Sequence, residues 1–209
     1  MRVVMDMETS MPKRKHPRLK EYDYSTNGAY FITVCTQDRR CLLSRIVGRG
    51  LAPAEIEYTK YGKIAEEQLL LLEYRYPFLK VEKYVIMPNH IHVIFMLDDA
   101  AAGASPRPTE MERYRAEQSE NNICRTGHEL PLGATRAVGA SPRPTIPEIV
   151  CAYKSLTTRA CKRAGFVTKL FQTSFYDHVI RGQADYDEIF RYIEENPLRW
   201  ELDKLYSEE

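Results

Sequence analysis

Two histidines separated by one isoleucine, His90 and His92, are the side chains of this chain best suited to bind a metal ion. They stand in an apolar run over residues 87–95, which favours a strand. Because side chains alternate between the faces of a strand, both imidazoles should point one way, with Ile91 and Val93 pointing the other. Such a pair can hold one metal ion, or it can simply be hydrogen-bonded within a sheet. A site that does chemistry needs a third protein ligand and a position left open for substrate.

A tyrosine and an amide near the C-terminus could complete such a site. Tyr192 and Asn196 are four residues apart in a segment with helical composition, so they share one helix face. A phenol there could attack a metal-bound phosphate while the amide oxygen completes the metal's ligands. The alternative is that Tyr192 packs at the surface and Asn196 caps the helix before Pro197. Spacing alone favours this second interpretation.

The segments around these residues predict an α+β fold. Strands are expected where β-branched and aromatic residues gather, over 29–36 and 80–87. Pro88-Asn89 predicts a turn and a third strand over 90–97, although one continuous strand with a bulge at Pro88 also fits. The remaining pattern predicts helices over 59–75, 147–164 and 183–195 and an extended segment over 170–180. This order suggests a ferredoxin-like antiparallel sheet, β-α-β-β-α-β, with helices on one face plus a C-terminal helix carrying the tyrosine.

The chain reads as one domain over residues 17–205, preceded by a flexible N-terminal segment over 1–16. A segment over 98–145 interrupts it. The same seven residues occur there twice, at 103–109 and 139–145, and the sequence between them is polar. Two copies are too few for a stacked repeat fold. The segment is therefore expected to be a surface insertion, largely disordered.

Composition excludes several classes of protein. The 209 residues carry a net charge of +1 with 44% hydrophobic residues, as expected for a soluble globular protein. No stretch approaches the ~18 consecutive apolar residues of a membrane span. The five cysteines are odd in number and form no C-x-x-C, which predicts reduced thiols in the cytoplasm.

Local basic clusters are the candidates for binding DNA phosphates. The first cluster lies near the N-terminus and contains Lys13, Arg14, Lys15 and Arg18. The second lies on the predicted basic helix and contains Lys154 and Arg159. Charge runs are often no more than solvated faces, and the clusters alone do not decide between these readings.

Four sequence segments together resemble a known family: YVIMPNHIHVIF, LFQTSFYDHVIR, YIEENPLRW and, near the start, DYSTNGAYFITVCT. They resemble the single-tyrosine HUH transposases of insertion sequences, most closely the REP-associated tyrosine transposases of bacteria. The resemblance covers roughly residues 17–201 without the insertion. It implies that His90 and His92 are metal ligands, that Tyr192 is the nucleophile and that Asn196 is the third metal ligand.

The resemblance also implies an activity. The protein would be a metal-dependent enzyme that cuts and rejoins single-stranded DNA, near hairpin-forming repeats, through a 5′-phosphotyrosine intermediate. The metal would be Mg²⁺ or Mn²⁺, since imidazole and amide ligands suit Mn²⁺ while Mg²⁺ tolerates open, hydrated sites. It would act on DNA in the bacterial cytoplasm, associated with the nucleoid and away from membranes, as a monomer or homodimer.

Other interpretations stay open at this point. The chain could be a catalytically idle nucleic-acid-binding protein on the same scaffold, or a metal phosphoesterase that releases its product by hydrolysis. Tyr153 on the basic helix is a competing nucleophile, but Thr157 stands where an amide would be needed. His178 is expected to serve packing or DNA contact.

Overall fold

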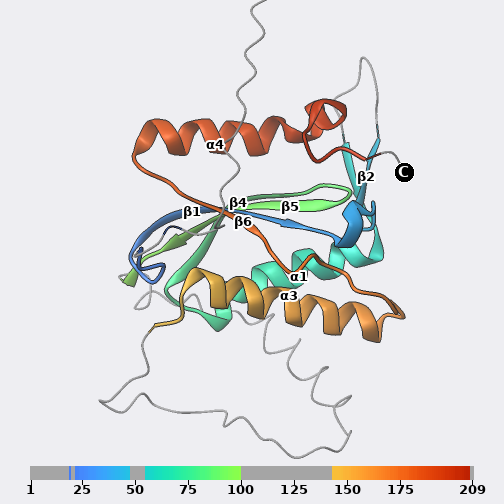
Figure 1. The fold of residues 1–209 in the computed structure, drawn as a ribbon, viewed down its shortest axis with the longest axis horizontal. Coiled ribbons are helices and arrows are strands. Elements are labelled where there is room, and N and C mark those ends of the chain that lie inside the picture. The colour runs from blue at the N-terminus through green and yellow to red at the C-terminus, as the bar shows by residue number, and fades with distance from the viewer. Residues whose placement is uncertain (1–18, 20–21, 48–54, 100–142, 208–209) are drawn as a thin grey trace, which may run out of the picture.

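A four-stranded antiparallel sheet forms the centre of the protein (Figure 1). The computed structural model describes residues 19, 22–47, 55–99 and 143–207. The sheet order is β4-β5-β1-β6, and each neighbouring pair runs antiparallel. The strands are β1 (Gly28–Cys35), β4 (Leu79–Ile86), β5 (His90–Leu97) and β6 (Tyr176–Val179). The predicted α+β class is therefore confirmed, and the predicted segment 1–16 and residues 100–142 of the predicted insertion lie outside the described residues.

Helices cover both faces of this sheet. Helices α1 (Lys60–Arg75) and α3 (Ile146–Arg163) lie together on one face, and α4 (Gln183–Glu195) lies on the other (Figure 1). Each predicted helix begins and ends within one residue of the observed one. Thr59 caps α1 by accepting hydrogen bonds from the first-turn amides, and Thr145 and Glu148 form a capping box at the start of α3.

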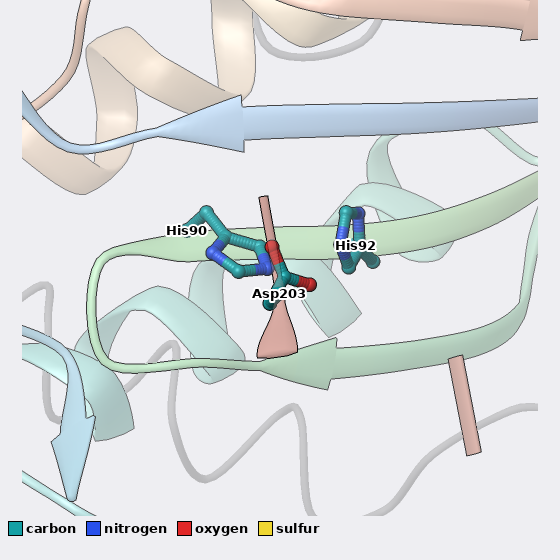
Figure 2. Close-up of side chains that lie close together, drawn as sticks. All are labelled: His90, His92 and Asp203. Atoms are coloured by element: carbon teal, nitrogen blue, oxygen red, sulfur yellow. The ribbon is translucent and has the colours of Figure 1, made fainter. Parts of the chain in front are cut away.

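Each face of the sheet has its own apolar cluster. The larger cluster fills the space between the sheet and α1 and α3, and it includes Ile91, Val93 and Phe95 of β5. The smaller cluster lies under α4 and includes Ile94 of the same strand. The alternation predicted for β5 is therefore confirmed, and the histidines of this strand (Figure 2) share the face covered by α4.

Two parts of the chain differ from the expected elements. A hairpin of β2 (Ser44–Val47) and β3 (Glu55–Tyr58) forms a separate small sheet, which the sequence pattern did not predict because the strands are short and half exposed. Pro197 was expected to stop the last helix. It ends the α-helical hydrogen bonding, but the chain continues as a 3-10 helix over Asn196–Leu202, since proline suits a first helical turn.

The turn between β4 and β5 is fixed by hydrogen bonds from several segments. Met87 N donates to His90 O at 2.9 Å, which closes a hairpin, so the continuous-strand alternative is wrong. Pro88 O accepts hydrogen bonds from the backbone amides of residues 42 and 43, at 2.9 and 3.0 Å. Asn89 O accepts from both the amide and the hydroxyl of Thr36. A buried turn is tolerated here because its backbone groups have partners.

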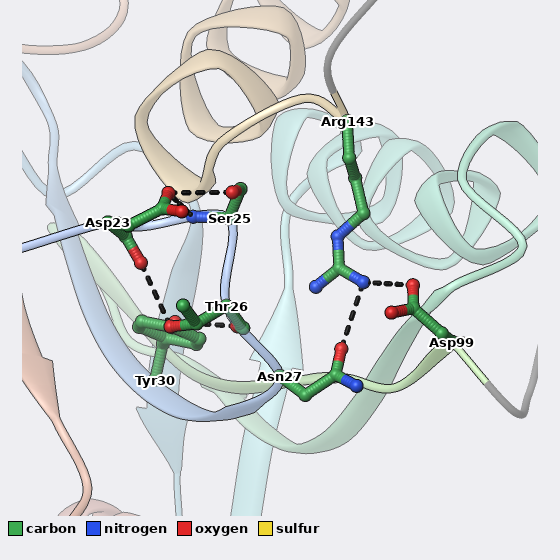
Figure 3. A network of polar contacts seen from close by, with 7 residues as sticks. All are labelled: Asp23, Ser25, Thr26, Asn27, Tyr30, Asp99 and Arg143. Carbon is green, nitrogen blue, oxygen red and sulfur yellow. Dashed lines mark hydrogen bonds and ion pairs between the residues drawn. The ribbon is translucent and has the colours of Figure 1, made fainter. Parts of the chain in front are cut away.

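Arg143 joins the two ends of the predicted insertion (Figure 3). Its Nη1 donates to the carboxylate of Asp99 and, at 2.9 Å, to Asn27 Oδ1. The guanidinium also lies over the ring of Phe78, 4.8 Å from its centroid. These contacts hold residues 99 and 143 side by side at the rim of the sheet.

Because Asp99 and Arg143 are in contact with each other, residues 100–142 between them should be removable without unfolding the domain. A Gly/Ser linker of about six residues spans up to ~20 Å and could join Asp99 to Arg143. We expect cooperative thermal unfolding with a melting temperature within about 4 °C of the full chain, which corresponds to roughly 1 kcal/mol. Arg143→Ala in the shortened chain should melt lower. Loss of cooperative unfolding in the shortened chain itself would contradict this expectation.

Gly62 permits close packing of α1 against the segment that supports the β4–β5 turn. A Cβ at this position would clash with the backbone carbonyl oxygen of Leu43, which accepts hydrogen bonds from Thr59 N and Oγ1 at the helix cap. Alanine gains about 1 kcal/mol of helix propensity over glycine, whereas overpacking typically costs about 1–3 kcal/mol. Here the clash is with backbone, so the packing cost should be the larger.

We therefore predict that Gly62→Ala lowers the free energy of unfolding, measured by urea denaturation. The exposed neighbour Lys63 provides the control, because Lys63→Ala should change stability by less than about 0.5 kcal/mol. A Gly62→Ala protein more stable than wild type would show that the backbone at Leu43 can shift away from the new methyl group at little cost.

Candidate active site

Two buried imidazoles form the centre of the site (Figure 2). His90 and His92 are 0% and 2% exposed, and their ring centroids lie 4.4 Å apart. Burial lowers the pKa of His90 to about 4 and lowers the pKa of His92 well below its ordinary value, with the neighbouring His90 adding to the second shift. Both rings are therefore neutral at physiological pH, which is the form that binds metals.

The hydrogen bond made by His90 sets its tautomer. Its Nδ1 lies 2.8 Å from Asn89 Oδ1, which can only accept, so Nδ1 carries the proton. The lone pair then sits on Nε2, which is buried and has no hydrogen-bond partner among the described residues. A metal-binding histidine normally has this arrangement, with one ring nitrogen held by a polar group and the other free for the ion.

Asn89 is itself held by the C-terminal segment. Its Nδ2 donates to Leu205 O and Ser207 Oγ, both at 2.8 Å, and to Arg39 O at 3.3 Å. The side chain therefore connects the turn before β5 to the end of the chain. Its orientation toward His90 depends on both.

His92 faces the tyrosine of α4. Its Nδ1 lies 2.8 Å from Thr33 Oγ1 on the neighbouring strand β1, and its Nε2 lies 3.3 Å from the hydroxyl oxygen of Tyr192. The Tyr192 ring packs edge-on against the rings of His92 and Phe31, with centroids at 5.2 and 6.1 Å. Histidine and tyrosine, 100 positions apart in sequence, thus meet within one chain.

Tyr192 is partly exposed, and its hydroxyl is hydrogen-bonded. The residue is 44% exposed, while its hydroxyl donates to Asp203 Oδ2 at 3.2 Å. Burial around the hydroxyl, together with the Asp203 carboxylate, raises the pKa of the phenol above its ordinary value. The phenol is therefore protonated at neutral pH, and its reaction as a nucleophile requires a nearby acceptor for the proton.

Asn196 follows one helical turn later and is 3% exposed. Its Nδ2 donates to Asp203 Oδ2 at 2.7 Å. Its Oδ1 is buried and has no hydrogen-bond partner among the described residues. An amide oxygen and an imidazole nitrogen, both buried and both unpaired, are therefore present in the same site.

Asp203 was not singled out from the sequence. It follows the 3-10 helix, and its carboxylate lies with the two histidines in a group whose ligand atoms are all within 4.8 Å of one another (Figure 2). These three residues could hold a metal ion. The sequence signal was weak, because Asp203 stands 11 positions after Tyr192 and beyond Pro197, where the pattern predicted no further element.

The donors fit a divalent cation. Two neutral imidazoles, one amide oxygen and one carboxylate are a mixed nitrogen and oxygen set of the kind that Mn²⁺ accepts. The two atoms of the site without partners belong to His90 and Asn196, two of the three residues that the sequence resemblance implies as ligands. The described residues thus bring together His90, His92, Tyr192 and Asn196. Their roles in metal binding and catalysis stay predictions.

Tyr153 and His178, which the sequence also singled out, make structural contacts away from the paired histidines. Tyr153 lies on α3, on the opposite side of the sheet from the histidines, where its buried hydroxyl donates to Ala65 O at 3.1 Å. It is not placed to act at this site. His178 on β6 lies 3.0 Å from Asp185 Oδ2, and Asp185 also accepts from Arg181 N at the start of α4. This contact fastens α4 to the sheet.

The two described basic residues that were predicted to bind DNA, Lys154 and Arg159, lie away from the histidines. Lys154 is half-buried and its Nζ donates to the carbonyl oxygens of residues 172 and 173, at 2.5 and 2.8 Å, so it holds the segment before β6. Arg159 is exposed on the same helix, which lies across the sheet from the tyrosine. The cluster over 13–18 lies outside the described residues. DNA binding by all of these residues stays a prediction.

Comparison with known proteins gives a few distant similarities. No family model matches the sequence. An uncharacterized protein of Haemophilus influenzae is 28% identical over 193 residues, which are 92% of this chain and 93% of that protein.

Two solved structures are also similar. A REP-associated tyrosine transposase bound to a REP hairpin has a TM-score of 0.49 and 18% identity, over 87% of this chain and 73% of that one. A protein of Deinococcus radiodurans R1, provisionally named a transposase, has a TM-score of 0.40 and 14% identity, over 85% of this chain and 95% of that one. Within the described part of the chain, no helix combines the length and apolar character needed to cross a membrane.

A metal at the two histidines should stabilise the folded protein. A ligand at about 100 times its Kd stabilises the native state by roughly 2.7 kcal/mol. We predict that Mn²⁺ raises the melting temperature of wild type and that His90→Ala removes this rise. His178→Ala is the control, since His178 pairs with Asp185 outside the site, and it should keep the rise even from a lower starting temperature. If Mn²⁺ raised the melting temperature of His90→Ala as much as that of wild type, the ion would bind elsewhere.

Proposed function

We propose that this protein is a transposase-like enzyme that cuts and rejoins single-stranded DNA through a phosphotyrosine bond at Tyr192. A divalent ion, Mg²⁺ or Mn²⁺, would be held by His90, His92 and Asn196. The observation that carries the proposal is the meeting of the phenol with the paired histidines: the Tyr192 hydroxyl oxygen lies 3.3 Å from His92 Nε2. The sequence resemblance to REP-associated tyrosine transposases supports the same activity.

The reaction can be written for the residues at hand. The Tyr192 oxygen attacks phosphorus, the bond between phosphorus and the 3′ oxygen breaks, and a 5′-phosphotyrosine and a free 3′-hydroxyl result. The Asp203 carboxylate, which accepts the hydrogen bond of the Tyr192 hydroxyl, can take the phenolic proton, and the leaving 3′ oxygen takes up a proton from water. A bound divalent ion would neutralise charge that develops on the phosphate oxygens. One phosphodiester replaces another, so a 3′-hydroxyl can reverse the step and join strands.

The scaffold is proposed to be the ferredoxin-like sheet with a C-terminal tyrosine helix. The strand order β4-β5-β1-β6 and the chain order of its helices support this assignment. On this scaffold β5 is a central strand, so both histidines sit in a rigid part of the sheet, while Tyr192 is on a helix that packs over it. A fixed metal site and an accessible nucleophile suit attack on a flexible single strand.

Tyr192→Phe should abolish the covalent protein–DNA adduct and leave binding of the DNA nearly unchanged, because the ring contacts with His92 and Phe31 remain. The measurement is a denaturing gel of labelled hairpin DNA with a single-stranded flank, incubated with and without Mn²⁺. Tyr153→Phe is the matched control and should form adduct as wild type does. It loses one buried hydrogen bond, worth about 1 kcal/mol.

The gel separates the alternatives. An adduct formed by Tyr192→Phe would show that another residue is the nucleophile. Wild type that binds the hairpin but forms no adduct with either metal would favour the idle DNA-binding interpretation. Cleavage without adduct would favour a hydrolytic phosphoesterase.

A further inference from the structure

We propose that Asp203 is a fourth protein ligand of the metal and the residue that orients Asn196 and Tyr192 toward it. This inference rests on the proposed function and extends it to a residue that the HUH-like sequence pattern does not include. The proposed ligand set adds one carboxylate to the two histidines and one amide that the resemblance implies.

The contacts of the carboxylate leave room for a cation. A carboxylate has about four acceptor positions. Asp203 Oδ2 accepts from Tyr192 and Asn196, and Oδ1 accepts from Leu205 N at 2.6 Å. About one position therefore remains, on a carboxylate whose ligand atom lies within 4.8 Å of those of both histidines.

Charge favours the same assignment. Imidazoles bind a metal in their neutral form, Asn196 is an amide, and the three groups that donate to Asp203 are a phenol, an amide and a backbone N–H. A divalent cation bound only by neutral buried groups would keep its whole charge away from water, which is costly. Asp203 is the carboxylate in the group, and its negative charge offsets half of that charge.

Asp203 also accounts for the orientation of the amide. Because Nδ2 of Asn196 donates to Asp203, the amide is held in one of its two flipped orientations, and its Oδ1 is the buried atom that has no partner among the described residues. The carboxylate therefore acts on the site twice, once as a ligand and once by presenting the amide oxygen.

Long-range packing keeps Asp203 in this position. The Trp200 ring lies beside the His90 ring at a tilt, with centroids 5.9 Å apart, and Tyr206 packs edge-on against Trp200 at 5.2 Å. Two residues after Asp203, the carbonyl of Leu205 accepts from the Asn89 side chain. Aromatic rings on both sides of Asp203 thus fix the chain as it passes the histidines.

The test is Mn²⁺ binding by isothermal titration to wild type, Asp203→Asn and Glu188→Gln. Asparagine keeps an acceptor for Leu205 N but loses the charge, and we expect its Mn²⁺ affinity to fall at least about tenfold. Glu188 is exposed on α4, so Glu188→Gln removes the same charge away from the site and should bind Mn²⁺ as wild type does. Adduct formation should fall with Mn²⁺ affinity in Asp203→Asn.

Several results would overturn this inference. Wild-type Mn²⁺ affinity in Asp203→Asn would exclude the carboxylate as a ligand, and a rise in adduct formation would show that it occupies the position of a substrate phosphate instead. Wild type that binds no Mn²⁺ would also exclude it. Asp203-dependent Mn²⁺ binding without any adduct would leave the inference standing and refute the proposed function. Thermal melting without metal checks folding, and Asp203→Ser receives the same titration if the asparagine variant does not fold.

Discussion

The structure depends on the burial of two neutral imidazoles between the sheet and α4. In that position each ring must satisfy its polar atoms without water; His92 has a partner at both ring nitrogens, whereas His90 has one at Nδ1 only. Asn89 and Thr33 contact the Nδ1 atoms of His90 and His92, while Nε2 of His92 lies 3.3 Å from the Tyr192 hydroxyl and Nε2 of His90 has no partner among the described residues. Burial therefore keeps the rings uncharged, and the contact with Asn89 leaves the lone pair of His90 on Nε2.

The same constraint explains why distant segments converge on a three-residue turn. The backbone and side chain of Asn89 are held by Thr36, by the carbonyl of Arg39 and by Leu205 and Ser207 near the end of the chain. None of these contacts is local. The C-terminal segment is hydrogen-bonded to this turn through Leu205 and Ser207, and Asp203 lies two residues before Leu205.

Much of the site could be predicted from short-range patterns. Alternation along a strand placed His90 and His92 on one face, and helical spacing placed Tyr192 and Asn196 together, because both rules depend only on backbone geometry. Asp203 could not be found in this way, since its place depends on packing of Trp200 and Tyr206 after the helix ends. Lys154 shows the converse: its charge suggested a DNA contact, but tertiary packing surrounds it with carbonyl oxygens. A charge pattern does not reveal which acceptors the fold brings near.

The unpaired atoms of the site carry a cost in stability. Leaving a buried polar atom without a partner costs about 1–3 kcal/mol, so His90 Nε2 and Asn196 Oδ1 together could cost roughly 2–6 kcal/mol. This is a large part of the ~5–15 kcal/mol that stabilises a typical domain. The larger apolar cluster under α1 and α3 lies on the other face and contains no part of the site, so it can offset this cost without altering the geometry around Tyr192. The face under α1 and α3 carries the larger apolar cluster, and the α4 face combines a smaller apolar cluster with polar atoms that have no protein partner among the described residues.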